Sequence, residues 1–183
     1  MKPKLILKNT NNFHLIKFHK IKIKLIKYSF GNVSLKKLIH LPSEIELFDF
    51  FYKNRNFYEK VCDVGANVGL HSIFMAKLFK KVGAYEPYNK HLKILKKNKK
   101  INNCNNLKIY SKAVSNSSSS KILNVLEDNT TASHLAKSTR SKYGRINRIK
   151  VKCEKFSNIV DTYDLIKLDI EGLEGLILKN IKF

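Results

Sequence analysis

From about Val61 onward, short apolar runs alternate with longer amphipathic stretches. The segments "KVCDVG" (60–65) and "VGAYEP" (82–87) are short and apolar, as is typical of buried strands. The segments "LHSIFMAKLFKK" (70–81) and "YNKHLKILKKNKKIN" (88–102) carry apolar residues at helical spacing. The pattern predicts strand, helix, strand, helix. The residues expected to face the core from the two helices are Ile73, Phe74, Ala76, Leu78, Leu92, Leu95 and Ile101.

The same rhythm continues toward the C-terminus. We expect strands at "NLKIYSKAV" (106–114), "RIKVKCEKF" (148–156) and "YDLIKLDI" (163–170), and a helix at "EGLEGLILKNI" (171–181). Residues 115–148 are polar and look irregular. Alternating strands and helices of these lengths predict an α/β fold, with a doubly wound, mostly parallel sheet and helices on both faces.

The N-terminal part has a different pattern. Residues 20–24 alternate apolar residues with lysine, which predicts a strand or hairpin with one solvated face. A turn is expected at Gly31–Asn32, and a helix at "PSEIELFDFFYK", where Ser43 and Glu46 have the spacing of a capping box. We therefore divide the chain into a basic N-terminal extension (1–42) and an α/β domain (43–183).

Length and composition agree with one globular domain. The 183 residues are 43% hydrophobic and 27% charged, which excludes a disordered chain. No apolar run has the length of a transmembrane segment, and no signal-peptide pattern opens the chain. The three cysteines, Cys62, Cys104 and Cys153, lack metal-ligand spacing, so we interpret them as reduced thiols and expect a cytoplasmic protein without a metal site.

The formal net charge of +22 invites a nucleic-acid hypothesis. However, proteins that grip phosphates or read bases favour arginine, because its planar guanidinium group makes paired hydrogen bonds. Of the 36 basic residues, the only arginines are Arg55, Arg140, Arg145 and Arg148, and the others are lysines. The excess of lysine, together with much asparagine and isoleucine, favours a coding bias spread over a solvated surface. An anionic partner such as RNA, a phospholipid surface or a nucleotide sugar stays an alternative.

The candidate chemistry lies where the strand 60–65 meets the next helix. In doubly wound sheets, ligands bind beyond the carboxyl ends of the strands. Gly65 allows a ligand to approach the backbone, and Gly69 allows tight packing or an unusual dihedral angle. Glu86 ends the following strand 21 residues after Gly65, the offset at which a carboxylate binds the hydroxyls of a cofactor ribose. The corner therefore predicts a ligand that contains a ribose.

Asp63 narrows the choice of ligand. The dinucleotide pattern G-x-G-x-x-G is absent, because three residues separate Gly65 from Gly69 and no third glycine follows. A carboxylate at the mouth of the loop would repel a pyrophosphate, but it could accept an ammonium group directly or through water. S-adenosylmethionine, which carries an amine, a sulfonium and a ribose, matches this corner better than NAD. The alternative is a glycine turn in an inert α/β domain.

Four blocks together resemble the FkbM family of S-adenosylmethionine-dependent methyltransferases. They are "DVGANVGLHS" (63–72), "YEP" (85–87), "LKKNKKINNCNNLKIYSKAVSN" (95–116) and "DLIKLDIEGLEGLILKNI" (164–181). The resemblance, which runs from about Ser43 to Phe183, implies a class I methyltransferase, Rossmann-like fold. It also implies O-methylation of a sugar or other small hydroxylated metabolite, with a small-molecule or glycan acceptor.

The resemblance further implies roles for single residues. Asp63, Gly65, Asn67 and Gly69 would line the methionine end of the cofactor. Glu86 would bind the ribose, and the adenine would pack near Ala113 and its neighbours Lys112 and Val114.

An alcohol acceptor also needs a base. Asp169 and Glu171 lie two residues apart at the end of the strand 163–170, so we expect them to share a face beside the glycine corner. Asp169 is the first candidate for base or acceptor orientation and Glu171 the second, with capping of the next helix as an equal alternative for Glu171. A cation site of Asp169, Glu171 and Glu174 is the less favoured interpretation. His71 is more readily explained as a packing residue than as a substrate contact.

Two departures from the family pattern stand out. The chain ends at "LKNIKF", where family members continue with further strands, so the sheet looks truncated after its fourth core strand, with its C-terminal strands missing. The strand 163–170 would then lie at a sheet edge, which promotes self-association. Lys155 and Phe156 also stand where the family has "LD".

Three hypotheses for function follow. The leading one is an O-methyltransferase that acts on a sugar or similar metabolite. The second is an RNA methyltransferase, which the charge favours. The third is a truncated remnant that binds a cofactor or partner without turnover.

Overall fold

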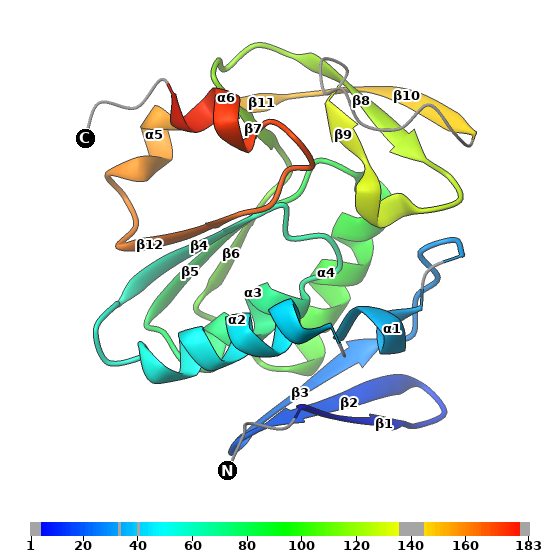
Figure 1. Ribbon diagram of the computed structural model, residues 1–183, viewed down its shortest axis with the longest axis vertical. Helices are drawn as coiled ribbons and strands as arrows, with labels where there is room; N and C mark the ends of the chain where they lie inside the picture. Colours follow the sequence, from blue (N-terminus) through cyan, green and yellow to red (C-terminus); the bar gives the residue numbers. More distant parts are fainter. Residues whose placement is uncertain (1–4, 33, 40, 136–144, 180–183) are drawn as a thin grey trace.

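Four parallel strands form the central sheet of the computed structural model, which describes residues 5–32, 34–39, 41–135 and 145–179. The strands are β4 (Lys60–Val64), β5 (Lys81–Tyr85), β6 (Leu107–Tyr110) and β12 (Leu165–Leu168). Their spatial order is β12-β4-β5-β6, and every neighbouring pair is parallel (Figure 1). Because the order reverses between β4 and β12, a crevice is expected at the carboxyl ends of these two strands.

Helices cover both faces of this sheet, as the sequence predicts. The helices α3 (Leu70–Ala76) and α4 (Asn89–Ile101) lie on one face, and the short helices α5 (Ser157–Val160) and α6 (Glu174–Leu178) lie on the other (Figure 1). Successive residues of β4 point to opposite faces. Val61 accordingly belongs to the larger hydrophobic cluster on the α3 side, whereas Cys62 and Val64 pack with α5 and α6. The fold is a doubly wound, Rossmann-like α/β fold.

The inward face of α4 differs from the predicted one, because it also contains His91 and Asn98 and does not contain Ile101. Leu92 and Leu95 are buried, but Ile101 is exposed, so its assignment to the core is wrong. The stripe of buried residues continues through Asn98 and Asn102, three and seven positions after Leu95. Asn98 is fully buried, and its amide donates to the carbonyl of Val68 at 2.8 Å. A polar residue is tolerated there because its hydrogen bonds are satisfied.

The N-terminal residues form a three-stranded antiparallel sheet, β1 (Leu5–Asn9), β2 (Phe13–Phe18) and β3 (Ile21–Ile26). In β3, Ile23 and Leu25 are buried while the intervening lysines are exposed, which gives the expected solvated face. The outer edge of β3 is covered by α4, because the side chains of Asn98 and Asn102 accept from the backbone amides of Ile26 and Lys24 at 2.8 Å each. The N-terminal sheet thus packs onto the core of the α/β part.

Two helices connect this sheet to β4. They are α1 (Leu35–Ile39) and α2 (Pro42–Lys53), and α2 buries Phe48 and Phe51. The predicted capping box of Ser43 and Glu46 is wrong. Leu41 is the N-cap residue, no side chain caps the helix, and Pro42 occupies the first turn. Proline suits the first helical position because the amide it lacks would have no partner in the helix, so Ser43 already lies inside the helix.

The part of the chain from residue 106 to 156 is more regular than its polar sequence suggests. The single strand expected over 106–114 is two strands, β6 and β7 (Ala113–Ser115). The irregular region contains β8 (Lys121–Leu126), η1 (Thr130–Ala132) and β9 (His134–Leu135). The strand expected over 148–156 is also two strands, β10 (Ile146–Val151) and β11 (Cys153–Lys155). β8 pairs with β9 and β10, and β11 runs parallel to β7. Residues 136–144 of this region lie outside the described residues.

β12 is an edge strand of the four-stranded sheet, and its four residues are half-buried rather than fully buried. The helix expected over 171–181 is the shorter α6, and residues 180 and 181 lie outside the described part. No helix within the described ranges is both long and apolar enough to span a membrane.

Candidate functional site

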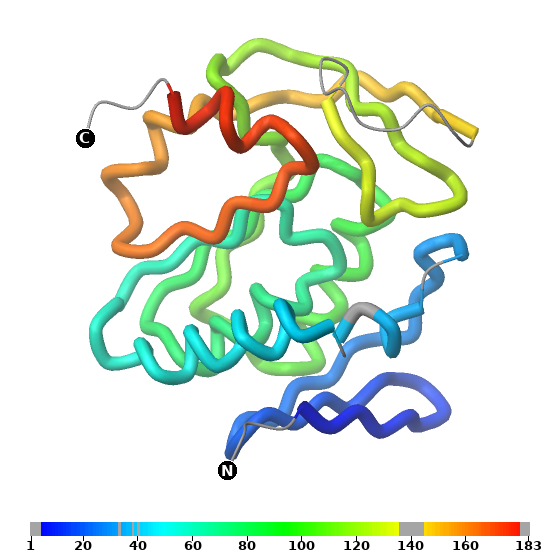
Figure 2. Tube along the Cα trace, in the orientation of Figure 1, coloured from blue at the N-terminus to red at the C-terminus, as the bar shows by residue number. Residues whose placement is uncertain are grey.

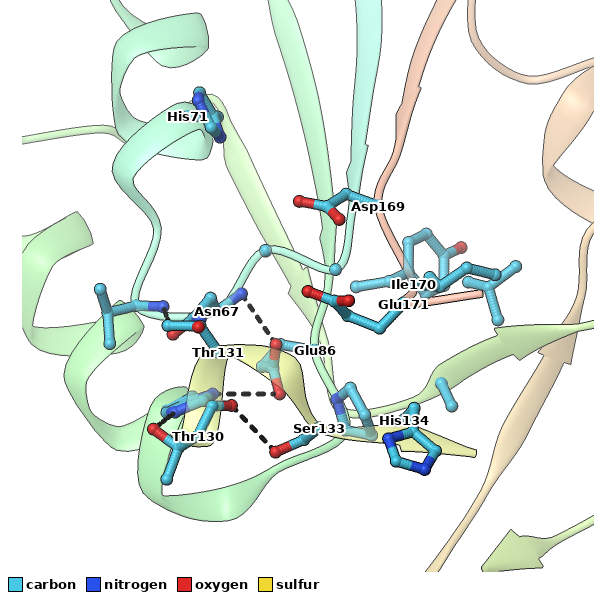
Figure 3. Close-up of a pocket in the computed structure, with 18 of the residues that line it drawn as sticks. Asn67, His71, Glu86, Thr130, Thr131, Ser133, His134, Asp169, Ile170 and Glu171 are labelled. Atoms are coloured by element: carbon cyan, nitrogen blue, oxygen red, sulfur yellow. Dashed lines mark hydrogen bonds and ion pairs between the residues drawn. The ribbon is translucent and has the colours of Figure 1, made fainter. Parts of the chain in front are cut away.

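A cavity of about 280 Å³ opens at the carboxyl ends of the central strands. Its walls come from the loop after β4, the residues after β5 and β6, the end of β12 and the segment η1–β9 (Figure 3). Its volume is close to the lower end of the roughly 300–1,000 Å³ that ligand pockets span. The cavity therefore lies where a doubly wound fold binds its ligand.

Gly65 shapes the loop after β4 and lines the cavity. Its φ of 83° lies in the left-handed region, which favours glycine. A Cβ atom there would lie 1.8 Å from the carbonyl oxygen of Asp169. The amides of Gly65 and Ala66 both donate to the carbonyl of Tyr85 at 3.0 Å. The loop is thus held tightly between the ends of β5 and β12.

Glu86 connects this loop to the end of β5. Its carboxylate accepts from the amide of Asn67 through Oε2 at 2.8 Å (Figure 3). It also accepts from the amide of Tyr88 through Oε1 at 2.8 Å. Glu86 and Asn67 both line the cavity, and Glu86 is only 6% exposed. Asn67 has a φ of 53°, a conformation that asparagine tolerates better than most residues. Each carboxylate oxygen keeps acceptor capacity beyond one amide, so Glu86 can also accept hydroxyl groups from the cavity.

Gly69 and Asp63 do not line the cavity. Gly69 is the N-cap residue of α3, and a Cβ atom on it would lie 2.2 Å from Cδ1 of Leu95, so its place is in the packing of α3 against α4. Asp63 is fully buried beneath the loop. Its Oδ2 accepts from the hydroxyl of Ser72 at 2.6 Å, and its Oδ1 lies 3.2 Å from Nζ of Lys167.

Lys167 joins Asp63 to the cavity. The parallel register places Lys167 directly opposite Asp63, and its Nζ also lies 3.3 Å from Oδ2 of Asp169. Burial raises the pKa of Asp63, but the charges of Lys167 and His71 and the hydrogen bond from Ser72 outweigh it, so this pKa is lowered. Burial lowers the pKa of Lys167, but the charges of its two carboxylate neighbours, Asp63 and Asp169, outweigh this effect, so the pKa is raised overall. Both groups are therefore charged at neutral pH.

Asp169 and Glu171 both line the cavity, on the side opposite Asn67 (Figure 3). The side chain of Asp169 is 58% exposed, so it is accessible from the cavity. Glu174, the first residue of α6, accepts from the amides of Ile170 and Gly172, which precede the helix, at 2.9 Å each. In the described residues no group of three histidine, cysteine, aspartate or glutamate side chains is placed to hold a metal ion.

The strands β7 and β8 supply the apolar side of the cavity. Ala113 lines it together with Val114 and Leu123, all three of them buried. The neighbouring Lys112 also lines the cavity, but its Nζ pairs with Oε2 of Glu154 at 2.6 Å. A flat apolar group would pack well in this region.

The segment Thr130–Leu135 forms a further wall of the cavity (Figure 3). It is tied to the N-terminal part, because the amide of Thr130 donates to the carbonyl of Phe30 and the amide of Asn32 donates to that of Asp128. Figure 2 shows the blue N-terminal trace reaching this yellow segment. His134, which the sequence places in this region, is buried and lies 3.4 Å from Asn124 through Nε2.

Sequence reasoning missed Lys167, Glu44 and His91. Each of them lines the cavity. A lysine inside the apolar run of "YDLIKLDI" was a usable signal for Lys167, since an unpaired charge is costly in a buried strand. His91 lies 3.1 Å from Oγ1 of Thr130 and 3.7 Å from Oε1 of Glu86. Glu44 had no local signal, because α2 brings it to the cavity from outside the motif region.

The cavity is acidic, although the chain as a whole is strongly basic. The carboxylates that line it are Glu44, Glu86, Asp169 and Glu171, and the lysines are Lys112 and Lys167. Each lysine is already paired with a carboxylate. A ligand with positive charge is therefore favoured over one with phosphate groups.

Comparisons with known proteins give one family model and several solved structures. A model of the methyltransferase FkbM domain matches residues 63–183. No curated protein matches the sequence. Among solved structures, an rRNA methylase from Streptococcus thermophilus is 21% identical, with a TM-score of 0.34 and coverage of 36% of this chain and 37% of that one.

Two further structures are similar to this chain. A SAM-dependent methyltransferase from Agrobacterium tumefaciens is 12% identical, with a TM-score of 0.43 and coverage of 58% and 34% of the two chains. TYW2 from M. jannaschii in complex with AdoMet is 27% identical, with a TM-score of 0.37 and coverage of 57% and 45%. The chain thus spans less than half the length of these three proteins.

Proposed function

The chain belongs to the family of the methyltransferase FkbM domain, and from this premise we propose that it O-methylates a sugar or other small hydroxylated metabolite with S-adenosylmethionine as cofactor. One observation carries the proposal. The carboxylate of Glu86, the loop at Gly65–Asn67 and Asp169, whose backbone adjoins Gly65, all line the same cavity.

The residues present fit S-adenosylmethionine. Glu86 lies at the end of β5 with acceptor capacity for the two ribose hydroxyls, and the buried apolar side near Ala113 suits an adenine. The acidic cavity suits a cofactor that carries a sulfonium and an ammonium group. Gly65 and Asn67 would lie along the methionine part. Asp63 and Gly69 would support that part from beneath the loop rather than touch it.

Methyl transfer mainly requires alignment of the two reactants. S-adenosylmethionine, when bound, would supply a methyl group on a sulfonium, from which a neutral thioether departs as an excellent leaving group. The chain must hold the acceptor hydroxyl in line, which can contribute several kcal/mol. Asp169 would accept the hydroxyl proton on its exposed carboxylate, and Lys167 would hold that carboxylate in place from 3.3 Å. Glu171 would bind a further hydroxyl of the acceptor.

The charges of the cavity support a neutral acceptor. Sugars and similar metabolites present hydroxyl groups, which carboxylates bind well as acceptors. Phosphate groups close to four carboxylates would be repelled. RNA methylation is the second candidate, which the net charge of +22 favours. Salt-sensitive RNA binding, with a steep loss of affinity on raising the salt concentration, would support it.

Titration calorimetry with S-adenosylmethionine tests the proposal first, and transfer of a labelled methyl group to a glycan pool and to an RNA pool tests it second. We expect binding, and label in the glycan or small-metabolite fraction. Label in RNA alone would establish the second candidate. Binding without transfer to either pool would indicate a non-catalytic remnant, and no binding would overturn both enzyme hypotheses.

Replacing Asp169 by asparagine is expected to lower kcat by about 10²-fold, in the range typical of a lost general base. Affinity for the cofactor should change little, since the base contacts the acceptor. Steady-state kinetics with the acceptor found above and calorimetry with the cofactor measure the two effects. Asp161→Asn is the matched control, because Asp161 is exposed outside the cavity. An unchanged kcat in Asp169→Asn would exclude the role as base.

Two further features belong to this proposal. The three cysteines are buried free thiols, which supports a cytoplasmic location. The edge position of β12 supports self-association through this strand.

A further inference from the structure

The sequence suggests Asp63 as the acceptor for the ammonium group of the cofactor, but its carboxylate cannot reach a ligand. The side chain is fully buried: Oδ2 accepts from the hydroxyl of Ser72, and Oδ1, which has no hydrogen-bond partner among the described residues, forms an ion pair with Nζ of Lys167 at 3.2 Å. Moving this carboxylate away would deprive the buried ammonium group of Lys167 of its fully buried partner. Among the side chains of the cavity, a different carboxylate is then the candidate partner for the ammonium group.

The order of the strands shows on which side that carboxylate lies. The ends of β12, β4, β5 and β6 follow one another across the sheet. If the ribose lies at Glu86 on β5, the apolar residues after β6 receive the adenine. The methionine part then extends in the opposite direction, over the loop after β4 and the first turn of α3, where His71 lines the cavity.

Glu44 lies on that side. It belongs to the first turn of α2, and its Oε2 lies 2.8 Å from Nε2 of His71. Its Oε1 has no hydrogen-bond partner among the residues that the structure describes. Its side chain is 23% exposed and lines the cavity, unlike that of Asp63. His71 thus fixes one oxygen of Glu44, and the other can accept from a ligand.

Glu86 and Asp169 are less suited to this task, and Glu171 lies with Asp169 beyond the end of β12. Glu86 accepts from two backbone amides at the ribose position. Asp169 is paired with Lys167 at the end of β12. Burial raises the pKa of Glu44, but the hydrogen bond and charge of His71 outweigh it, so this pKa is lowered and the group is charged at neutral pH.

We propose that Glu44 binds the ammonium group in the methionine part of S-adenosylmethionine, and that His71 acts as a positioning residue for its carboxylate. This inference rests on the proposed function, because it needs the cofactor to occupy the cavity. Glu44 lies outside residues 63–183, the part that the family model matches. The N-terminal part of the chain would therefore complete the cofactor site rather than only support the fold.

The test compares two ligands that differ only in the ammonium group, S-adenosylhomocysteine and its des-amino analogue. Calorimetry measures the affinity of both for the wild type and for Glu44→Gln. The wild type should bind S-adenosylhomocysteine at least about 10-fold more tightly than the analogue, as expected for a charged hydrogen bond. In Glu44→Gln this preference should disappear while the affinity for the analogue stays unchanged.

Two variants serve as controls. Glu46→Gln makes the same charge change on an exposed position of α2 and should keep the wild-type preference. Glu86→Gln should lower the affinity for both ligands by the same factor, because both ligands carry the ribose. Equal affinity of the wild type for the two ligands would overturn the role of Glu44, even if Glu44→Gln failed to fold. A preference that persists in Glu44→Gln would also overturn it. Failure of the wild type to bind either ligand would instead overturn the proposed function.

Discussion

Replacing Asp63 by asparagine is expected to lower the free energy of unfolding by about 3–5 kcal/mol, the cost of breaking a buried ion pair by removing one partner. The side chain of Lys167 is only 9% exposed, and its nearest other carboxylate is the exposed Asp169. The variant would leave a buried ammonium group without its fully buried partner. Chemical denaturation at pH 7 measures the change.

The effect of Asp63→Asn should depend on pH in a defined direction. The pKa of Asp63 is lowered in the folded protein, so its contribution to stability is present above the unfolded pKa of about 3.9 and is lost as the pH falls through the folded pKa. The pKa of Lys167 is raised, so its contribution is present below its ordinary value of 10.5. The difference between wild type and variant should therefore be largest between these limits and shrink in acid.

A surface pair provides the control for Asp63→Asn. Glu59 and Lys80 form an exposed ion pair, and Glu59→Gln should change the free energy of unfolding by less than about 1 kcal/mol. Equal effects of the two substitutions would show that the pair of Asp63 and Lys167 does not stabilise the fold. A difference that is the same at pH 7 and at acid pH would contradict the ionic origin of the effect.

Replacing Gly65 by alanine is expected to abolish cofactor binding and to destabilise the protein. Two costs add at this position. A left-handed conformation costs a non-glycine residue about 1–2 kcal/mol, and forcing a methyl group into packed structure costs typically about 1–3 kcal/mol. The Cβ atom would lie 1.8 Å from the backbone oxygen of Asp169, so the loop and the end of β12 must separate. The cavity between them would lose its shape.

Calorimetry with S-adenosylhomocysteine and thermal unfolding check this prediction. Gly175→Ala is the matched control, because a Cβ atom on Gly175 meets nothing within 4 Å and the residue lies in α6. Alanine favours a helix over glycine, so the control should be neutral or slightly stabilised. Wild-type cofactor affinity in Gly65→Ala would show that the loop is not part of the binding site.

The front half of the fold was predictable because its signals are local. The strand at 60–64, the glycine turn and the strand that ends before Glu86 follow from apolar periodicity and from residues within a few positions of one another. Predictions that depended on contacts between distant parts of the sequence were wrong or incomplete. Ile101 has the spacing of a core residue, but α4 packs against β3 through Asn98 and Asn102 instead. The strand β8 was missed because its partners, β9 and β10, lie in other parts of the sequence.

The sequence by itself determined the order of strands and helices, the position of the glycine turn and the offset between Gly65 and Glu86. These depend on backbone preferences and on periodicity along the chain. Only the tertiary structure decided which charges face the cavity. The register of β4 and β12 pairs Asp63 with Lys167 and so removes Asp63 from the cavity, while the packing of α2 against α3 brings Glu44 to His71. Burial and charge pairing depend on neighbours that are distant in the sequence, and no local pattern records them.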